Sequence, residues 1–235
     1  WATGGNLNDG RSVMGAAGTG HTTGLVFGGS PPSTVNTESY NGTSWTEVNN
    51  LPTIKYALAG LGTATAAIAA GGGAAPNNAK TESWNGTNWT EVNDINSGRD
   101  NLAGTGLQTA GIITGGFEPG SSLSGKTEQY NGTNWTETTD LNTARAYLGM
   151  GGTSTSAVAA GGAPGTKSET ETWNGSNWTE TTDLNTARYM IGASGASNTD
   201  TIMFGGNPVP GAGGLTEQWN GSGWTEVADL STVRA

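Results

Sequence analysis

The sequence has no cysteine in 235 residues and only one histidine, His21. The missing cysteine excludes a disulfide framework, a thiolate metal site and a cysteine nucleophile, so stability has to come from packing. A Ser-His-Asp triad would have to use His21, and no G-x-S-x-G motif accompanies that residue. The G-H-T-T-G sequence around it predicts a solvated turn between two strands, and we expect neither a catalytic role nor a metal there.

Basic residues and long apolar runs are also scarce. Nine lysines and arginines stand against nineteen acidic residues, for a formal charge of −10. This charge has the wrong sign for binding a phosphate backbone, which argues against nucleic acid as a partner. No apolar stretch approaches the length of a membrane span, so we expect no membrane insertion. Leucine, isoleucine and phenylalanine are few while 41 glycines are present, a composition typical of short strands joined by tight turns.

The motif T-E-x-[W/Y]-N-G-[T/S]-x-W-T-E occurs five times. Its second tryptophan recurs every 43 to 46 residues, and Trp1 continues the series as a truncated sixth copy. Strand-only repeats of this length are typical of propeller blades. The sequence therefore predicts an all-β fold, a five-bladed β-propeller of four-stranded antiparallel blades, as one domain over residues 1–235. The motif tryptophans are Trp45, Trp89, Trp135, Trp178 and Trp224.

An Asn-Gly pair separates the two outer strands of every copy. Asn-Gly suits a two-residue type I′ turn, which would place Trp84 opposite Thr87 and Thr81 opposite Thr90. The same register predicts a Thr–Thr pair in all five copies. Upstream, residues 58–63 and 66–70 are rich in alanine and glycine, as crowded strands near a central axis should be.

A Gly-Gly pair closes the second inner strand of each copy. We expect the backbone to bend there, or to approach another segment closely, because glycine tolerates both. The pairs are Gly28-Gly29, Gly71-Gly72, Gly115-Gly116, Gly161-Gly162 and Gly205-Gly206.

The order of these features resembles the kelch repeat, the unit of kelch-type propellers and of the propeller in galactose oxidase. The resemblance covers the whole chain, although Lys55 stands at a position where the other copies have arginine. Galactose oxidase would imply two histidine ligands and a tyrosine cross-linked to cysteine, which this composition excludes, so no cofactor is expected. The repeats also resemble near-identical propeller repeats of bacteria and phages. Beside the Gly-Gly pairs and the motif tryptophans, the matching positions are Tyr40, Trp84, Tyr130, Trp173, Trp219, Arg11, Arg99, Arg145 and Arg188.

Glutamate recurs at two positions of every copy. A catalytic carboxylate pair needs two unlike environments, whereas a repeated glutamate meets nearly the same one each time, so we interpret these residues as scaffold. Asp94 and its equivalents, each followed at the fifth residue by arginine, are predicted to be loop caps or ion pairs between blades. The glutamates are Glu38, Glu82, Glu128, Glu171, Glu217, Glu47, Glu91, Glu137, Glu180 and Glu226.

The segment W-x5-[L/I]-x3-[R/K] occurs six times, against five Gly-Gly strands and five Asn-Gly turns. Either Trp1–Arg11 or Trp224–Arg234 is therefore surplus. We expect the last blade to use its own Trp224 strand, with Trp1–Leu7 a partial duplicate at the rim. A spare strand favours a homo-oligomer or filament, and a longer repeat array is the alternative.

The loops between Gly-Gly and the next T-E vary from 8 to 11 residue steps. Variable loops on one face of a repeat array often mark its binding face, and aromatic side chains stack on sugars. The sequence thus predicts a non-enzymatic binding module for carbohydrate or a surface glycoconjugate, extracellular or virion-associated. The alternative is a structural virion, appendage or filament subunit with protein partners. Candidate ligand-binding residues are Tyr56, Asn77, Asn78, Phe117, Glu118, Tyr147, Tyr189 and Asn207.

Overall fold

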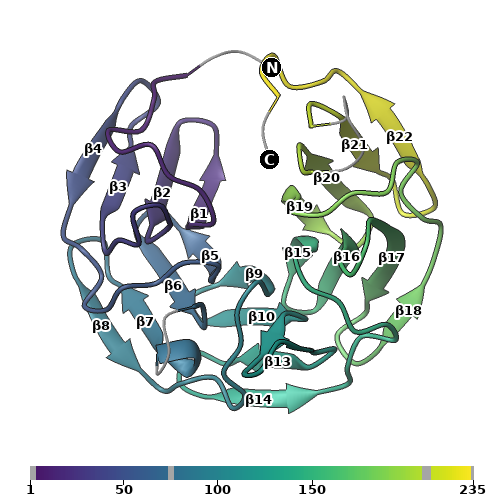
Figure 1. Cartoon of the computed structure of the whole chain (residues 1–235), viewed down its shortest axis with the longest axis horizontal. Coiled ribbons are helices and arrows are strands. Elements are labelled where there is room, and N and C mark those ends of the chain that lie inside the picture. Colours follow the sequence, from purple (N-terminus) through teal and green to yellow (C-terminus); the bar gives the residue numbers. More distant parts are fainter. Residues whose placement is uncertain (1–3, 74–76, 208–212, 234–235) are drawn as a thin grey trace.

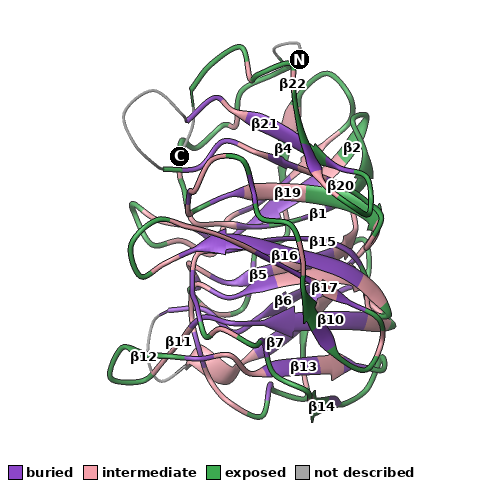
Figure 2. Cartoon of the chain, turned by 90° about the vertical axis from the view of Figure 1, so that its right-hand side faces the viewer, coloured by how far each residue is buried: buried purple, intermediate pink, exposed green. Residues whose placement is uncertain are grey.

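Five four-stranded antiparallel sheets stand around a central axis in the computed structural model, which describes residues 4–73, 77–207 and 213–233 (Figure 1). The predicted five-bladed β-propeller is confirmed. Buried residues lie mostly in the strands, and exposed residues lie mostly in the loops at the two ends (Figure 2).

Each blade runs from its innermost to its outermost strand in chain order. Blade 1 contains β1 (Gly15–Gly20), β2 (Thr23–Phe27), β3 (Thr37–Tyr40) and β4 (Trp45–Val48), and blade 2 contains β5 (Ala59–Thr63), β6 (Ala66–Ala70), β7 (Thr81–Trp84) and β8 (Trp89–Val92). Blade 3 contains β9 (Ala103–Leu107), β10 (Ala110–Thr114), β13 (Thr127–Tyr130) and β14 (Trp135–Thr138), and blade 4 contains β15 (Gly149–Thr153), β16 (Ser156–Gly162), β17 (Lys167–Trp173) and β18 (Trp178–Glu180). Blade 5 contains β19 (Gly192–Ser197), β20 (Asp200–Phe204), β21 (Thr216–Trp219) and β22 (Trp224–Val227). The hairpin β11 (Phe117–Glu118) and β12 (Ser122–Leu123) and the 3-10 turn η1 (Asn77–Ala79) lie between blade strands.

The last blade is completed by its own outer strand, as expected, because β22 pairs with β21. At the other end of the chain, residues 4–7 belong to no strand. Trp1 and Arg234 of the predicted doubled end lie outside the described residues.

Small residues let the inner strands of neighbouring blades pack closely. A Cβ added at Gly60 in β5 would lie only 2.3 Å from the backbone nitrogen of Ala16 in β1. The Gly-Gly bends follow the expectation as well: Gly115 has a φ of +69°, and a Cβ there would lie 2.5 Å from the Arg145 carbonyl oxygen. Larger side chains at these positions would push the blades apart.

The predicted hairpin register is wrong by two residues. Trp84 pairs with Trp89 and Ser83 with Thr90, so the turn contains four residues and the predicted Thr–Thr pairs do not form. The Asn85 side chain explains the longer turn, because its Oδ1 accepts hydrogen bonds from the backbone of Thr87 and Asn88 at 2.9 and 2.8 Å. This side-chain cap spares Asn85 the positive φ of a type I′ turn. The two aromatic rings of each blade are therefore direct cross-strand partners.

The hydrophobic core is divided among the contacts between neighbouring blades, which we call joints. Four core clusters exist among the described residues, and each combines inner-strand residues of one blade with the tryptophan pair or Tyr–Trp pair of the next. In the first cluster, Phe27 of blade 1 packs edge-on against Trp89 of blade 2, with ring centroids 4.8 Å apart. Burying such large rings is the main source of stability.

A buried ion pair ties each blade to the linker that enters it. Arg99, in the linker after blade 2, donates to Glu128 Oε1 of blade 3 at 2.6 Å. The backbone and side-chain nitrogens of Asn96 donate to the other carboxylate oxygen at 2.7 and 2.8 Å. The arginines therefore pair with third-strand glutamates, whereas Asp94 caps β7 by accepting from the Thr81 backbone at 3.1 Å. The equivalent ion pairs are Arg11–Glu38, Lys55–Glu82, Arg145–Glu171 and Arg188–Glu217.

We predict that Glu128→Gln destabilises the protein by about 3–5 kcal/mol, because it leaves the buried Arg99 cation without a counter-charge. Denaturant unfolding measures the loss. Glu91→Gln is the matched control, since Glu91 pairs with Lys80 at the surface and its side chain is 51% exposed, so its effect should be far smaller. Similar losses for the two variants would contradict a special role for the buried pair.

Candidate functional site

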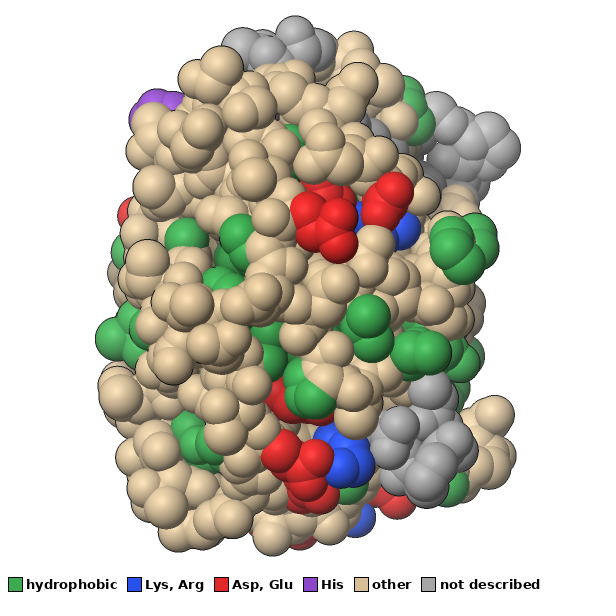
Figure 3. Space-filling model, turned by 90° about the vertical axis from the view of Figure 1, so that its left-hand side faces the viewer, with side chains coloured by type: hydrophobic (Ala, Val, Ile, Leu, Met, Phe, Trp, Pro, Cys, Tyr) green, Lys and Arg blue, Asp and Glu red, His purple; other side chains and the backbone are tan. Residues whose placement is uncertain are grey.

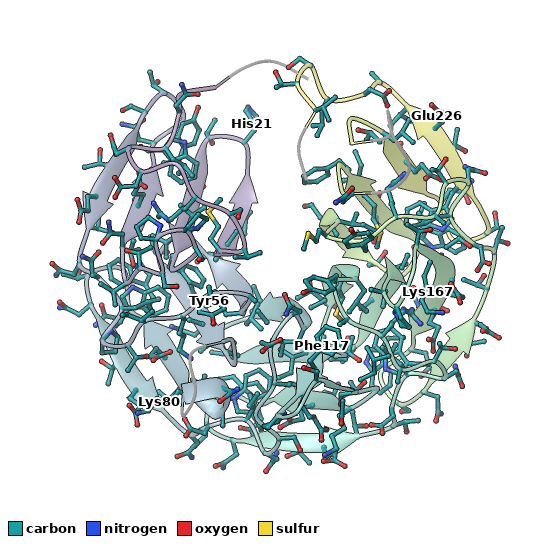
Figure 4. All side chains as sticks on the ribbon, viewed as in Figure 1. His21, Tyr56, Lys80, Phe117, Lys167 and Glu226 are labelled. Carbon is teal, nitrogen blue, oxygen red and sulfur yellow. The ribbon has the colours of Figure 1, made fainter. Side chains whose placement is uncertain are left out.

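The linkers and the loops after Gly-Gly lie on one end of the propeller, which we call the linker face. In each blade the residue after the basic position pairs with the residue just past Gly-Gly. The backbone of Gly73 donates to the Tyr56 carbonyl at 2.7 Å, and Tyr189 forms an antiparallel bridge with Asn207. The linkers and the variable loops therefore lie on the same face. Figure 4 places Tyr56 and Phe117 nearer the axis than Lys80 and Glu226 on the outer rim.

A chain of backbone hydrogen bonds runs from blade to blade around the axis. It joins five residues, each two positions after a basic residue and each with φ between 48° and 58°. Each of four backbone nitrogens donates to the carbonyl of the preceding member, at 2.6 to 2.9 Å. These belt residues are Val13, Ala57, Asn101, Tyr147 and Met190.

Three aromatic side chains form a row beside the belt. Phe117 contacts Tyr147 edge-on with ring centroids 5.7 Å apart, and Tyr147 contacts Tyr189 in the same way at 6.0 Å. All three are half-buried. A cavity of about 300 Å³ at the mouth of the axis is lined by Tyr147, Tyr56 and Asn101, among others. Two of the candidate residues, Tyr56 and Tyr147, therefore line this cavity, and Phe117 and Tyr189 contact Tyr147.

An acidic group that sequence reasoning missed lies among these rings. Burial raises the pKa of the Asp100 carboxyl, although Asn101 Nδ2 donates to it at 2.6 Å. Burial also raises the pKa of Tyr147, with further contributions from the charges of Asp100 and Tyr189. Asp100 and Asn101 differ in type from their equivalents in the other blades, so no repeated pattern could have indicated them.

The remaining candidate residues have structural partners. Asn78 accepts from the Arg99 backbone at 3.1 Å through its carbonyl, with Asn77 beside it in η1. Glu118 lies 3.0 Å from Lys126 Nζ, which lowers the pKa of that carboxyl. Asn207 is exposed and donates its backbone N–H to Tyr189. These residues surround the aromatic row rather than belonging to it.

Nothing in the described part of the chain gathers three or more potential metal ligands from His, Cys, Asp and Glu. His21 is exposed in the turn between β1 and β2, away from the aromatic row. Figure 3 shows only scattered charged and hydrophobic side chains on one side of the molecule. Over the described ranges, no helix is long and apolar enough to cross a bilayer.

Comparisons with known proteins support the fold alone. No family model matches the chain, and no curated protein is similar in sequence. Among solved structures, the chain is similar to YjhT, with a TM-score of 0.77 over 97% of this chain and 86% of that one, at 10% sequence identity.

We predict that Asp100→Asn stabilises the protein at neutral pH. The folded state raises the pKa of Asp100, so the stability contributed by this group falls as the pH rises through the folded-state pKa. Asparagine carries no charge, and its gain over the parent should shrink as the pH falls to the ordinary range of aspartate. Unfolding midpoints across pH measure this, with the exposed Asp200→Asn as control. A pH-independent difference between variant and parent would contradict the assignment.

Proposed function

We propose that the protein is a non-enzymatic binding module that recognises carbohydrate or a surface glycoconjugate through its linker face. The observation that carries the proposal is the row of Phe117, Tyr147 and Tyr189 beside a cavity that Asn101 lines, with the Asp100 carboxyl hydrogen-bonded to Asn101. Ring faces accept the apolar faces of sugars, while Asp100 and Asn101 offer hydrogen-bonding groups to hydroxyls. An extracellular or virion-associated location belongs to the same proposal.

The repeated carboxylates support a binding role over a catalytic one. All five third-strand glutamates are engaged by a cation of the preceding linker. Both oxygens of such a carboxylate accept hydrogen bonds from the linker, as in Glu128, so the group is poorly placed to contact a substrate. The Gly-Gly, aromatic and basic positions of each blade also support a kelch-type relationship, which we include in the proposal.

Tyr147→Ala should weaken binding to a glycan array by about tenfold or more, since loss of a central aromatic contact commonly costs at least that much affinity. His21→Ala, on the opposite end of the propeller, is the control and should bind like the parent. The proposal fails if no glycan binds the parent, or if both variants bind equally well.

A structural role is the second candidate, and a specific observation favours it. Blades 5 and 1 face each other across a cleft of about 870 Å³ lined by apolar residues such as Met14 and Phe204. A virion, appendage or filament subunit would use such a surface for protein contacts. Concentration-dependent assembly measured by sedimentation, without glycan binding, would favour this candidate.

A further inference from the structure

The propeller is open at one joint. The inner strands pack in the pairs β1–β5, β5–β9, β9–β15 and β15–β19, whereas β19 and β1 have no comparable contact (Figure 1). None of the core clusters formed by the described residues spans blades 5 and 1. The cleft of about 870 Å³ lies there instead.

Residues on the side of blade 1 toward blade 5 are more exposed than their equivalents in blade 2, and Met14 and Trp45 among them line the cleft. Tyr40 and Trp45 are half-exposed, whereas their equivalents in blade 2, Trp84 and Trp89, are 2% and 9% exposed. Met14 is half-exposed, and its equivalent Leu58 is 6% exposed. Each of these equivalents belongs to the cluster at the first joint. The side of blade 1 toward blade 5 therefore has the residues of a joint, but no neighbouring blade of the described chain packs against it.

Among the described residues, blade 5 lacks a tryptophan-to-threonine hydrogen bond on the side toward blade 1. At three closed joints the outer tryptophan of one blade donates to a threonine hydroxyl of the blade before it, as Trp89 Nε1 does to Thr37 Oγ1 at 3.1 Å. The joint between blades 2 and 3 lacks this bond, with Trp135 and Thr81 both buried. In blade 5 the equivalent Thr216 hydroxyl is fully buried, and no described group bonds to it. Its position is that of an acceptor for one more tryptophan.

Blade 1 does not satisfy this acceptor. Trp45 is the outer tryptophan of blade 1, and its Nε1 donates to the Gly5 carbonyl at 3.1 Å. The belt is interrupted at the same place, since no hydrogen bond joins the Val13 backbone nitrogen to the Met190 carbonyl. Blade 5 and blade 1 thus each keep, on the two sides of the cleft, groups that form hydrogen bonds at other joints.

The linkers show what the open joint is built to hold. Each linker connects two blades, and its cation pairs with the glutamate of the blade it enters. Glu38 of blade 1 is already occupied by Arg11 and by Asn8, whose backbone nitrogen donates at 2.7 Å. The segment after blade 5 carries a sixth basic residue, Arg234, which lies outside the described residues, and the five third-strand glutamates already pair with the other five cations. Six basic positions of the sequence therefore stand against five third-strand glutamates.

We propose that the joint between blades 5 and 1 receives a sixth blade, formed by one further copy of the repeat continuous with Ala235. Its first residue would be a belt residue, two positions after Arg234, that donates to Met190 and accepts from Val13. Its tryptophan would donate to Thr216, and its glutamate would pair with Arg234. This sixth blade buries the apolar residues of blade 5 and of blade 1 that line the cleft.

The test extends the full chain by a copy of residues 147–180, which supplies a belt residue, four strands, a glutamate and a tryptophan. Because repeat proteins gain stability with each interface, closing two joints should raise the melting temperature by roughly 5–10 °C. Acrylamide quenching should also fall at Trp45, whose share of the fluorescence is identified with Trp45→Phe. The control extension has glutamine in place of the copied glutamate and should lose most of the gain.

A second measurement uses the chain without any extension. Thr37→Val should lower the melting temperature, because Trp89 loses its acceptor, whereas Thr216→Val should leave it unchanged or raise it. In the extended chain, Thr216→Val should become destabilising.

Three results would overturn the proposal. One is an extended chain that matches the parent in melting temperature and in quenching. Another is equal destabilisation of the parent by the two threonine substitutions, which would mean that Thr216 already has a partner. The third is a dimer of the parent with Trp45 protected, since a second copy would then be the occupant.

Discussion

A buried cation on a glutamate of the next blade is the contact on which the other features depend. Removing the two charges from water is costly unless both groups are paired and hydrogen-bonded. The ion pair therefore fixes where each linker meets the blade that it enters. The one departure follows the same physics. Pro52 lacks the N–H that Asn8, Asn96, Asn142 and Asn185 supply in the other linkers that enter a blade. Glu82 instead accepts from the Thr53 hydroxyl at 2.6 Å and lies 3.0 Å from Lys55 Nζ. The joint thus tolerates a different set of donors, with Glu82 Oε2 held by the Lys55 ion pair and by no hydrogen bond from a described residue.

The candidate binding site follows from this constraint. Once the cation is fixed, the next residue bridges to the loop past Gly-Gly, and the one after it enters the belt with positive φ. Backbone groups make these contacts, so the side chains there are free to differ between blades. The aromatic row of Phe117, Tyr147 and Tyr189 is therefore held by a rigid frame although it lies on loops.

The fold was largely predictable because it depends on local signals. The repeat period predicts the blades, and the alanine- and glycine-rich segments predict the inner strands. The hairpin register was not predictable in this way, since the Asn85 side chain competes with the two-residue turn that Asn-Gly favours. The partners of Arg99 and its equivalents lie in the next blade, beyond local reasoning. Of the candidate site, the aromatic residues were found from loop position, whereas Asp100 was missed because only packing reveals its burial.

Across its described residues the molecule has four closed joints and one open joint, and backbone hydrogen exchange of the belt residues measures this difference directly. Exchange should be slow at Ala57, Asn101, Tyr147 and Met190, by about a hundredfold or more relative to exposed amides, because each donates across a closed joint. Exchange should be fast at Val13, whose nitrogen faces the open joint. Protection of Val13 equal to that of the other four amides would contradict an open joint between blades 5 and 1.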